Sequence, residues 1–317
     1  MANNQVSLKI GIVNPADWLD HDENTPLPLQ QHPTYGRALE TFGATAKQVT
    51  FSAGATVVGH ALLIERRFFG LISFTTIFRG PVWRDPATPD EVKSAAYTAL
   101  KKLSSPWRWN FICVMPEQPH SDSMQPFMQK AGYRRVMSGF STCWLDLRPE
   151  PKEIRAALKG KWRNQLVKAE SSGLDISFGG RKAHQYTWLL EKEAEQRSKR
   201  RYQATPLGLV PAFVRAATPK SASGVMAVTA LKDKRKIAGA LFLIHGNSAT
   251  YHIGWAGDDA RKLNAQNQIL WEGIGALKRQ GVRFLDLGGL NTADLAGIAR
   301  FKLGMGGTPL TLAGAFV

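Results

Sequence analysis

The sequence has little of what staples small secreted proteins or binds metal ions. It contains two cysteines in 317 residues, Cys113 and Cys143, which form neither a disulfide framework nor a metal-type spacing. Seven histidines are scattered along the chain, and none has a cysteine or carboxylate at a convincing ligand offset. The composition therefore predicts a reducing compartment and no metal site.

Motifs of covalent and nucleotide-dependent catalysis are also missing. The sequence contains no Gly-x-Ser-x-Gly elbow and no phosphate loop ending in Gly-Lys-Ser/Thr. Both cysteines fall within apolar strand candidates, where burial keeps a thiol protonated and inert. We therefore expect no covalent enzyme intermediate and no cofactor.

Long hydrophobic runs are absent too. The longest apolar run, 237–244, is too short to cross a bilayer, so no transmembrane segment is expected. The first residues lack the basic and then apolar order of a signal peptide. These features predict a cytoplasmic protein.

Acidic residues are scarce relative to basic ones. Lys and Arg number 41 against 25 Asp and Glu, giving a formal net charge of +16 and a pI near 10.0. Such a field favours phosphate-bearing partners: nucleic acid, a nucleotide-linked substrate or an anionic membrane surface. The alternative is a merely soluble basic protein, since the composition of 44% hydrophobic and 21% charged residues is that of an ordinary globular chain.

The length favours two domains, and Arg148-Pro149-Glu150-Pro151 is a plausible linker. The predicted domains are 1–148 and 149–317, with the last strand able to pack back on the first domain. In the first half, the patterns predict strands at 8–13, 44–52, 57–64, 71–78, 111–115 and 141–147, and helices at 34–42, 91–103 and 123–131. In the second half, they predict helices at 152–172, 181–202, 208–217, 264–280 and 292–303, and strands at 174–178, 224–231, 237–244, 249–255, 283–287 and 309–317.

The two halves share one order of elements: three meander strands, a helix, a strand, a helix, a glycine and a strand. The order occurs over 44–147 and again over 224–317, although the residues themselves hardly repeat. We therefore expect an α/β (α+β) protein in which one supersecondary plan occurs twice.

The stretch 263–307 has the character of a site. An amphipathic helix ends at Gly281, and a short strand follows that ends at the Gly288-Gly289 pair. The next helix, which Thr292 can cap, leads into Phe301-Lys302-Leu303-Gly304-Met305-Gly306-Gly307. Glycines allow close approach of backbone and ligand, so Lys302 is predicted to be a cation in a confined place. Asp286 either takes a proton or caps the next loop, and we favour the cap.

This stretch resembles the C-terminal signature of the FemABX family of aminoacyl-tRNA-dependent peptidyl transferases. The matching residues are Leu270-Trp271-Glu272, Ile274, Gly281, Asp286, Gly288-Gly289 and Phe301-Lys302-x-Gly-x-Gly. The resemblance implies two tandem GNAT-like acyltransferase domains, each a mixed twisted sheet flanked by helices. It extends weakly over the whole chain, which contains no heptad insertion and therefore resembles the compact, armless FemX-like type.

The resemblance also implies roles for individual residues. Lys302 would stabilise the oxyanion and Phe301 would line the acyl pocket. Substrate contacts are implied for Arg197, Arg201, Tyr202, Tyr251, Tyr35 and Arg37, the last two in an inter-domain cleft. For the tRNA phosphates, the basic residues of the first helix of the second half are expected: Lys159, Arg163 and Lys168.

The predicted function is transfer of an amino acid from aminoacyl-tRNA to an amine of a peptide, such as a UDP-linked muropeptide in peptidoglycan biosynthesis. One alternative is an acyl-CoA-dependent N-acyltransferase; against it, the expected glycines are replaced by Asn264 and Gln266. Another is a non-catalytic protein of the same fold that binds RNA or a nucleotide. We expect a monomer that does not bind DNA, and leave a peripheral membrane contact open.

Overall fold

The computed structural model describes residues 8–14, 17, 25–200, 204–290 and 296–317. The chain divides into two compact units, unit 1 with residues Met1–Phe140 and Thr311–Val317 and unit 2 with Ser141–Leu310. The predicted boundary between residues 148 and 149, in the proline-rich stretch, lies a few residues later than the observed division, which falls after Phe140. The reason is strand β8 (Ser141–Asp146), which pairs with β13 (Phe284–Asp286) in unit 2.

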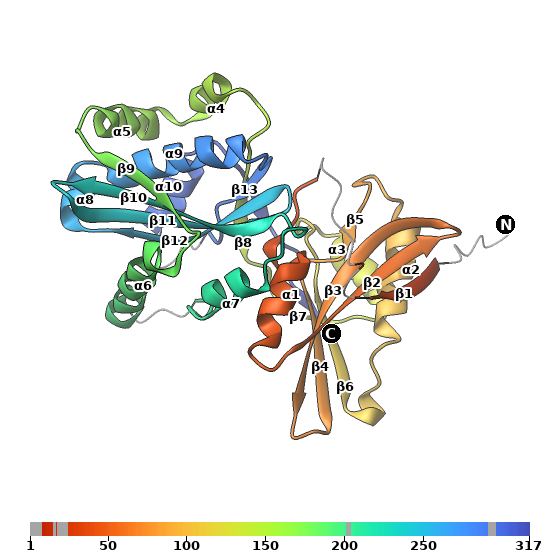
Figure 1. Cartoon of the computed structure of the whole chain (residues 1–317). Helices are drawn as coiled ribbons and strands as arrows, with labels where there is room; N and C mark the ends of the chain where they lie inside the picture. The colour runs from red at the N-terminus through yellow and green to blue at the C-terminus, as the bar shows by residue number, and fades with distance from the viewer. Residues whose placement is uncertain (1–7, 15–16, 18–24, 201–203, 291–295) are drawn as a thin grey trace. The chain divides into compact units, whose positions relative to one another are not determined.

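Unit 1 contains a mixed eight-stranded sheet of order β1-β2-β3-β4-β6-β15-β7, with β5 paired to β3 (Figure 1). The strands are β1 (Leu8–Val13), β2 (Thr45–Ala53), β3 (Thr56–Phe68), β4 (Ile72–Phe78), β5 (Val82–Trp83), β6 (Asn110–Met115), β7 (Arg135–Met137) and β15 (Ala315–Phe316). The helices are α1 (Pro33–Glu40), α2 (Asp90–Lys101) and α3 (Met124–Lys130), with 3-10 turns at Leu29–Gln31 and Pro106–Arg108. Strands β1 to β4 run antiparallel, whereas β4 and β6 are parallel.

The core of unit 1 is centred on aromatic side chains. The ring of Tyr97 meets those of Trp83, Phe127 and Tyr133 edge-on, and the Tyr133 hydroxyl donates to the Tyr97 carbonyl at 3.1 Å. Phe316, near the end of the chain, is buried in the same core. Burying one such ring stabilises the fold by about 1.5–3 kcal/mol, so the C-terminal strand is a structural part of unit 1.

Unit 2 contains a seven-stranded sheet of order β14-β8-β13-β12-β11-β10-β9. Its remaining strands are β9 (Asp175–Gly179), β10 (Ser223–Lys232), β11 (Arg235–His245), β12 (Ser248–Ala256) and β14 (Thr308–Thr311). The helices are α4 (Pro151–Ala157), α5 (Gly160–Glu170), α6 (Thr187–Arg200), α7 (Leu209–Ala216), α8 (Asp258–Lys262), α9 (Ala265–Arg279) and α10 (Ala296–Leu303), with a 3-10 turn at Ala183–Gln185. Figure 1 shows α4, α5 and α9 on one face of this sheet and α6 and α7 on the other.

The basic helix predicted over 152–172 is two helices, α4 and α5. Its apolar stripe is real, because Ile154, Leu158, Trp162 and Leu166 are all buried in the core of unit 2. The helix breaks because Leu158 and Lys159 are extended, and the Lys159 N–H donates to the carbonyl of Gly304 at 2.9 Å. A tertiary hydrogen bond thus replaces the local one that the periodicity predicted.

The duplicated plan is present, but the last strand of each half joins the sheet of the other unit. Strand β8 closes the plan of the first half and lies between β13 and β14 in the sheet of unit 2. Strand β15 closes the plan of the second half and lies between β6 and β7 in the sheet of unit 1. The single strand predicted over 309–317 is therefore two short strands. Among the described residues, no helix is long and apolar enough to span a membrane.

Candidate active site

Strands β12 and β13 separate after a short run of parallel pairing. The paired register ends at Thr250 with Asp286, whereas β12 continues to Ala256. Within β12 the register with β11 shifts and leaves His252 outside the pairing, as in a β-bulge. A bulge bends its strand and re-aims its side chains. The divergence of the two strands opens a space within unit 2.

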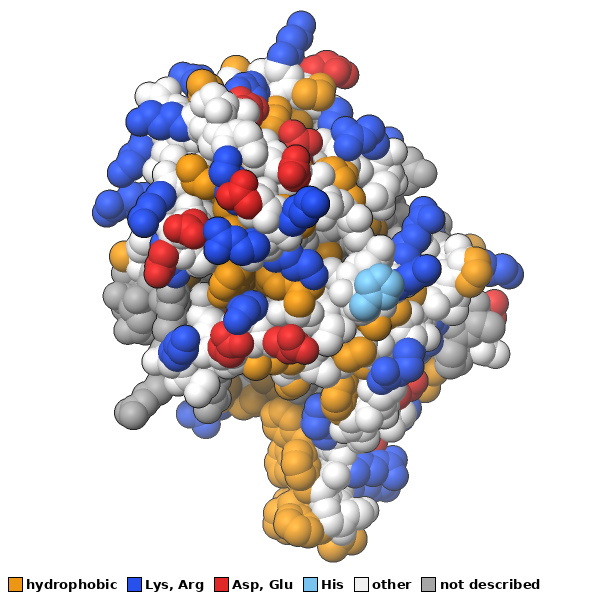
Figure 2. Space-filling view, turned by 60° about the vertical axis from the view of Figure 1, so that its left-hand side comes forward, with side chains coloured by type: hydrophobic (Ala, Val, Ile, Leu, Met, Phe, Trp, Pro, Cys, Tyr) orange, Lys and Arg blue, Asp and Glu red, His pale blue; other side chains and the backbone are white. Residues whose placement is uncertain are grey.

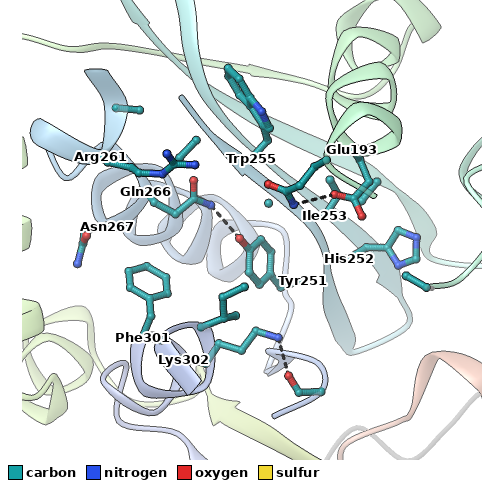
Figure 3. Close-up of a pocket in the computed structure, with 18 of the residues that line it drawn as sticks. Glu193, Tyr251, His252, Ile253, Trp255, Arg261, Gln266, Asn267, Phe301 and Lys302 are labelled. Atoms are coloured by element: carbon teal, nitrogen blue, oxygen red, sulfur yellow. Dashed lines mark hydrogen bonds between the residues drawn. The ribbon is translucent and has the colours of Figure 1, made fainter. Parts of the chain in front are cut away.

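A cavity of about 730 Å³ occupies this space, within the range of small-ligand sites. Its walls come from α6, β12, the region of α8 and α9, and α10 (Figure 3). The lining residues are Glu193, Gln196, Arg197, Ala204, Thr205, Tyr251, His252, Ile253, Gly254, Trp255, Ala256, Ala260, Arg261, Asn264, Gln266, Asn267, Gly289, Gly297, Ile298, Phe301 and Lys302. All belong to unit 2.

Lys302 extends from the last turn of α10 into this cavity. Its Nζ donates to the carbonyl of Gly289 at 2.9 Å and lies 6.0 Å from the centre of the Tyr251 ring (Figure 3). Burial lowers the pKa of Lys302, and the Asp286 carboxylate acts in the opposite direction. A partly desolvated cation interacts more strongly with a developing anion than one in water does.

The turn after Lys302 is held by the helix pair α4 and α5. The ring of Phe301 packs 5.8 Å from that of Trp162, centroid to centroid. A Cβ at Gly304 would stand 2.8 Å from the Trp162 side chain, closer than real Cβ contacts, so this position requires glycine. The hydrogen bond from the Lys159 N–H to the Gly304 carbonyl joins the same turn to the start of α5. The break in the basic helix therefore fixes the segment that carries Lys302.

Asp286 acts as a cap, as the sequence analysis favoured. The carboxylate is 1% exposed, and its Oδ1 accepts from the Thr142 hydroxyl at 2.6 Å and from the Gly288 N–H at 2.8 Å. Gly288 has a φ of 73°, which suits glycine. These bonds shape the turn that presents the Gly289 carbonyl to Lys302.

Tyr251 is held in the cavity by a partner that the sequence analysis missed. Its hydroxyl accepts from Nε2 of Gln266 at 2.8 Å (Figure 3), and a Cβ at Gly254 would collide with that hydroxyl. Burial raises the pKa of Tyr251, which keeps the phenol protonated. Tyr251 and Gln266 come from a strand and a helix, so no local pattern indicates the pair.

The cavity wall carries a buried carboxylate on α6 and a neutral histidine on β12. Nε of Arg197 donates to Glu193 at 2.8 Å, and another of its nitrogens donates to the carbonyl of Thr205 at 2.7 Å. Burial, aided by Arg197, lowers the pKa of His252 to about 4. Arg197 was predicted as a substrate contact and lines the cavity. Glu193 and His252 were not predicted, because their burial depends on how α6 packs on β12.

The residue before α9 adopts the left-handed backbone conformation that glycine favours, although it is an asparagine. Asn264 has a φ of 53°, a left-handed conformation that asparagine tolerates better than most residues. Gln266, two positions on, fills the cavity wall with its side chain rather than leaving the backbone open. The left-handed backbone suits a phosphate-binding turn, whereas the Gln266 side chain, which donates to Tyr251, lies where such turns have a glycine.

The other predicted residues lie elsewhere. Tyr35 and Arg37 belong to α1 of unit 1, where burial raises the pKa of Tyr35 to about 12. Lys159 directly precedes α5, and Arg163 and Lys168 lie within that helix, Lys168 in its last turn. All three are exposed and are not among the lining residues in the described part of the chain. The remaining two, Arg201 and Tyr202, lie outside the described residues.

Residues 156–303 match the family described as acetyltransferase (GNAT) domain. The crystal structure of FemX superposes with a TM-score of 0.77 at 13% identity, covering 97% of this chain and 96% of FemX. The chain has a tandem GNAT fold. A tandem GNAT protein from the clavulanic acid biosynthesis pathway superposes with a TM-score of 0.56 at 13% identity, covering 98% of this chain and 97% of its own.

A third similar structure is the C-terminal domain of a putative lysylphosphatidylglycerol synthetase from Agrobacterium fabrum. It has a TM-score of 0.52 at 13% identity and covers 91% of this chain and 87% of that domain. No curated protein sequence matches the chain. At these identities the likeness concerns the fold alone, so the FemX-like resemblance is confirmed at that level: the fold is like that of FemX over almost the whole chain.

Proposed function

We propose that this protein transfers an amino acid from aminoacyl-tRNA to an amine of a peptide, namely the stem peptide of a UDP-linked cell-wall precursor. The observation that carries the proposal is the position of Lys302, whose Nζ lies in the cavity beside Tyr251 and the turn at Gly289. The FemX-like fold and the Phe-Lys-x-Gly-x-Gly motif support it.

The reaction is aminolysis of an ester that is already activated. The neutral acceptor amine attacks the aminoacyl carbonyl carbon, a C–N bond forms and the carbonyl oxygen becomes an oxyanion. The C–O bond to the tRNA ribose then breaks, and the amine proton passes to the released hydroxyl or to solvent. Lys302, protonated, stabilises the oxyanion, and Phe301 lines the acyl side of the cavity. No cofactor is required.

The pH dependence follows from the charge that Lys302 must carry. Because burial lowers its pKa, the protonated form is lost at a lower pH than for an exposed lysine. The rate of the chemical step should therefore fall as pH rises through that lowered pKa. A chemical step that stays constant up to the ordinary lysine range would contradict this role.

The remaining contacts follow from charge. The exposed basic side chains of Lys159, Arg163 and Lys168 bind tRNA phosphates, as suits a chain of net charge +16. The acceptor phosphates bind at the α6 wall, where Arg197 lines the cavity and Arg201 and Tyr202 follow in sequence. We assign Tyr35 and Arg37 to the acceptor peptide, and propose a cytoplasmic monomer.

The test incubates the protein with a pool of charged tRNAs and candidate muropeptides and follows the mass gain of the acceptor. Gain of one aminoacyl residue with the wild type, and its loss in Lys302→Ala, is expected. Lys262→Ala serves as the matched control, because Lys262 is exposed on α8 and does not line the cavity. If charged tRNA binds without any transfer, the non-catalytic alternative replaces the proposal.

An acyl-CoA-dependent N-acyltransferase is the second candidate. Two observations favour it: the left-handed backbone of Asn264 at the start of α9, and Arg261 in the cavity wall beside it. Together they form the kind of helix start that binds a pyrophosphate. Under our proposal, calorimetric titration detects weak or no acetyl-CoA binding because the Gln266 side chain fills this place. Micromolar affinity would favour the second candidate.

A further inference from the structure

One end of the unit 1 sheet carries a cluster of exposed hydrophobic side chains. Phe69 is 94% exposed and Trp107 is 96% exposed, which is unusual for such large apolar groups. Figure 2 shows hydrophobic side chains gathered on the projection at its lower edge, where β3 ends and β4 and β6 begin in Figure 1. We call this cluster the aromatic tip: Phe68, Phe69, Leu71, Phe74, Trp107, Trp109 and Phe111.

The aromatic tip is built on paired strands. Phe74 of β4 stands opposite Phe111 of β6 in the parallel register, and the N–H of Ser73 donates to the carbonyl of Trp109 at 2.9 Å. Phe69 and Trp109 both have a φ of 53°, a backbone conformation that bulky residues rarely adopt. The fold thus holds large apolar side chains in solvent at a cost in backbone strain, which indicates a use for them.

The surroundings of the tip are basic. Neither 66–74 nor 101–111 contains an aspartate or glutamate, whereas Arg66, Arg67, Lys102 and Arg108 are exposed there. The nearby carboxylate of Glu65 pairs with Lys47 at 3.0 Å and with Arg67 at 2.7 Å. An apolar projection bordered by basic residues suits the interface of an anionic bilayer, where apolar side chains enter the acyl region and cations meet the headgroups.

We propose that the aromatic tip inserts into the interface of an anionic membrane, with Arg66 and Arg108 contacting lipid phosphates. A membrane is favoured over single-stranded RNA because Leu71, which is 78% exposed, adds apolar area that a bilayer buries and that base stacking does not use. A second copy is disfavoured because two basic surfaces repel each other. The inference does not depend on the transferase activity.

The first test measures sedimentation of the full-length protein with vesicles of phosphatidylglycerol and phosphatidylcholine, compared with phosphatidylcholine alone. The double variant Phe69→Ser, Trp107→Ser should lower the partition coefficient about tenfold or more, since it removes two large apolar groups from the bilayer. Ile12→Ser is the control, because Ile12 is 78% exposed in the same unit but lies outside the tip. Both variants should unfold at the wild-type temperature, because the substituted side chains are exposed.

The second test concerns charge. Arg108→Gln should lower partition into the anionic vesicles about fivefold and leave partition into zwitterionic vesicles unchanged. The proposal is overturned if the wild type binds neither kind of vesicle or binds both kinds equally. It is also overturned if the double variant binds the anionic vesicles as well as the wild type does. It is equally overturned if the double variant loses tRNA affinity or changes the oligomeric state while vesicle binding persists.

Discussion

Each sheet contains a parallel pair of strands at the equivalent place in the shared plan, β4 with β6 in unit 1 and β12 with β13 in unit 2, and the two pairs end differently. In unit 1, β4 and β6 stay paired to the last residue of each, Phe78 with Met115. In unit 2, β13 ends where its pairing with β12 ends, at Thr250 with Asp286, whereas β12 continues to Ala256 with only β11, among the described strands, beside it. The same order of elements therefore keeps its parallel pair together to the end of both strands in unit 1, whereas in unit 2 one strand of the pair extends well beyond the other.

The space beyond each pair is filled in unit 1 and hollow in unit 2. Arg79, directly after β4, makes two bonds of 2.6 Å to the carboxylate of Glu117, directly beyond β6. Both side chains are largely buried. At the corresponding place in unit 2 lie the cavity and Lys302. The ion pair beyond the parallel strands of unit 1 fits a scaffold role, whereas the Lys302 ammonium extends into the cavity of unit 2.

The start of helix α2 in unit 1 also differs from the start of helix α9 in unit 2. Helix α2 of unit 1 begins with Asp90 and Glu91, whose charge repels an anion. In unit 2 the cavity wall near the start of α9 includes Arg261 and the left-handed Asn264. Arg261 is paired with Asp258 at 2.6 Å, so it is the left-handed backbone before α9 that favours an anionic ligand in unit 2, whereas the acidic first turn of α2 disfavours one in unit 1.

The largest effect is expected from opening the closed end of unit 1. Arg79→Met leaves the Glu117 carboxylate buried without its ion-pair partner, which should lower the free energy of unfolding by about 3 kcal/mol. Urea denaturation measures it. Arg148→Met is the control, because the pair of Arg148 with Asp146 is about half exposed and should contribute about 1 kcal/mol or less. Equal losses in the two variants would contradict the scaffold role.

Removing the Lys302 ammonium from the cavity of unit 2 should affect catalysis rather than folding. Lys302→Ala should lower the rate of transfer about 100-fold or more, the usual scale for one oxyanion-stabilising group. Acceptor binding should change far less, because the contact is used in the transition state. Single-turnover kinetics with a charged tRNA measures the first and equilibrium binding the second. Wild-type turnover in Lys302→Ala would exclude Lys302 from the chemistry.

The bulged strand of unit 2 should make the stability depend on pH. The folded pKa of His252 is about 4, below the ordinary value of about 6.5, so between these values the unfolded state binds a proton that the folded state does not. The free energy of unfolding should therefore fall as pH drops, by about 2 kcal/mol at pH 5. Comparing His252→Gln with wild type at pH 7 and pH 5 isolates this contribution. His184→Gln, at an exposed site, should leave the pH dependence intact.

The smallest effect is expected at the α6 wall. Arg197→Ala should raise the apparent KM for the acceptor about tenfold and lower turnover less, because an arginine that binds phosphate contributes similarly to ground state and transition state. The substitution also frees Glu193, so the double variant Arg197→Ala, Glu193→Gln separates the two causes. If the double variant restores the wild-type KM, Arg197 serves only to neutralise Glu193.

Much of the fold could be predicted from local patterns, and part of the site with it. The helix predicted over 264–280 is α9, Ala265–Arg279, because its apolar spacing and the glycine after it are local signals. The buried stripe from Ile154 to Leu166 was equally readable. The break between α4 and α5 was not, since it depends on the bond from Lys159 to Gly304, far along the chain.

The sequence by itself determined that one order of elements occurs twice, that the chain is basic, and that a lysine near the end of a helix is followed by a glycine-rich turn. Each is a property of neighbouring residues, which periodicity and composition report directly. Tertiary structure decided which sheet receives β8 and β15, where β12 leaves β13, and how Tyr251, Gln266 and Lys302 meet around one cavity. These depend on pairing and packing between distant segments, for which a strand's own residues show its burial but not its neighbour.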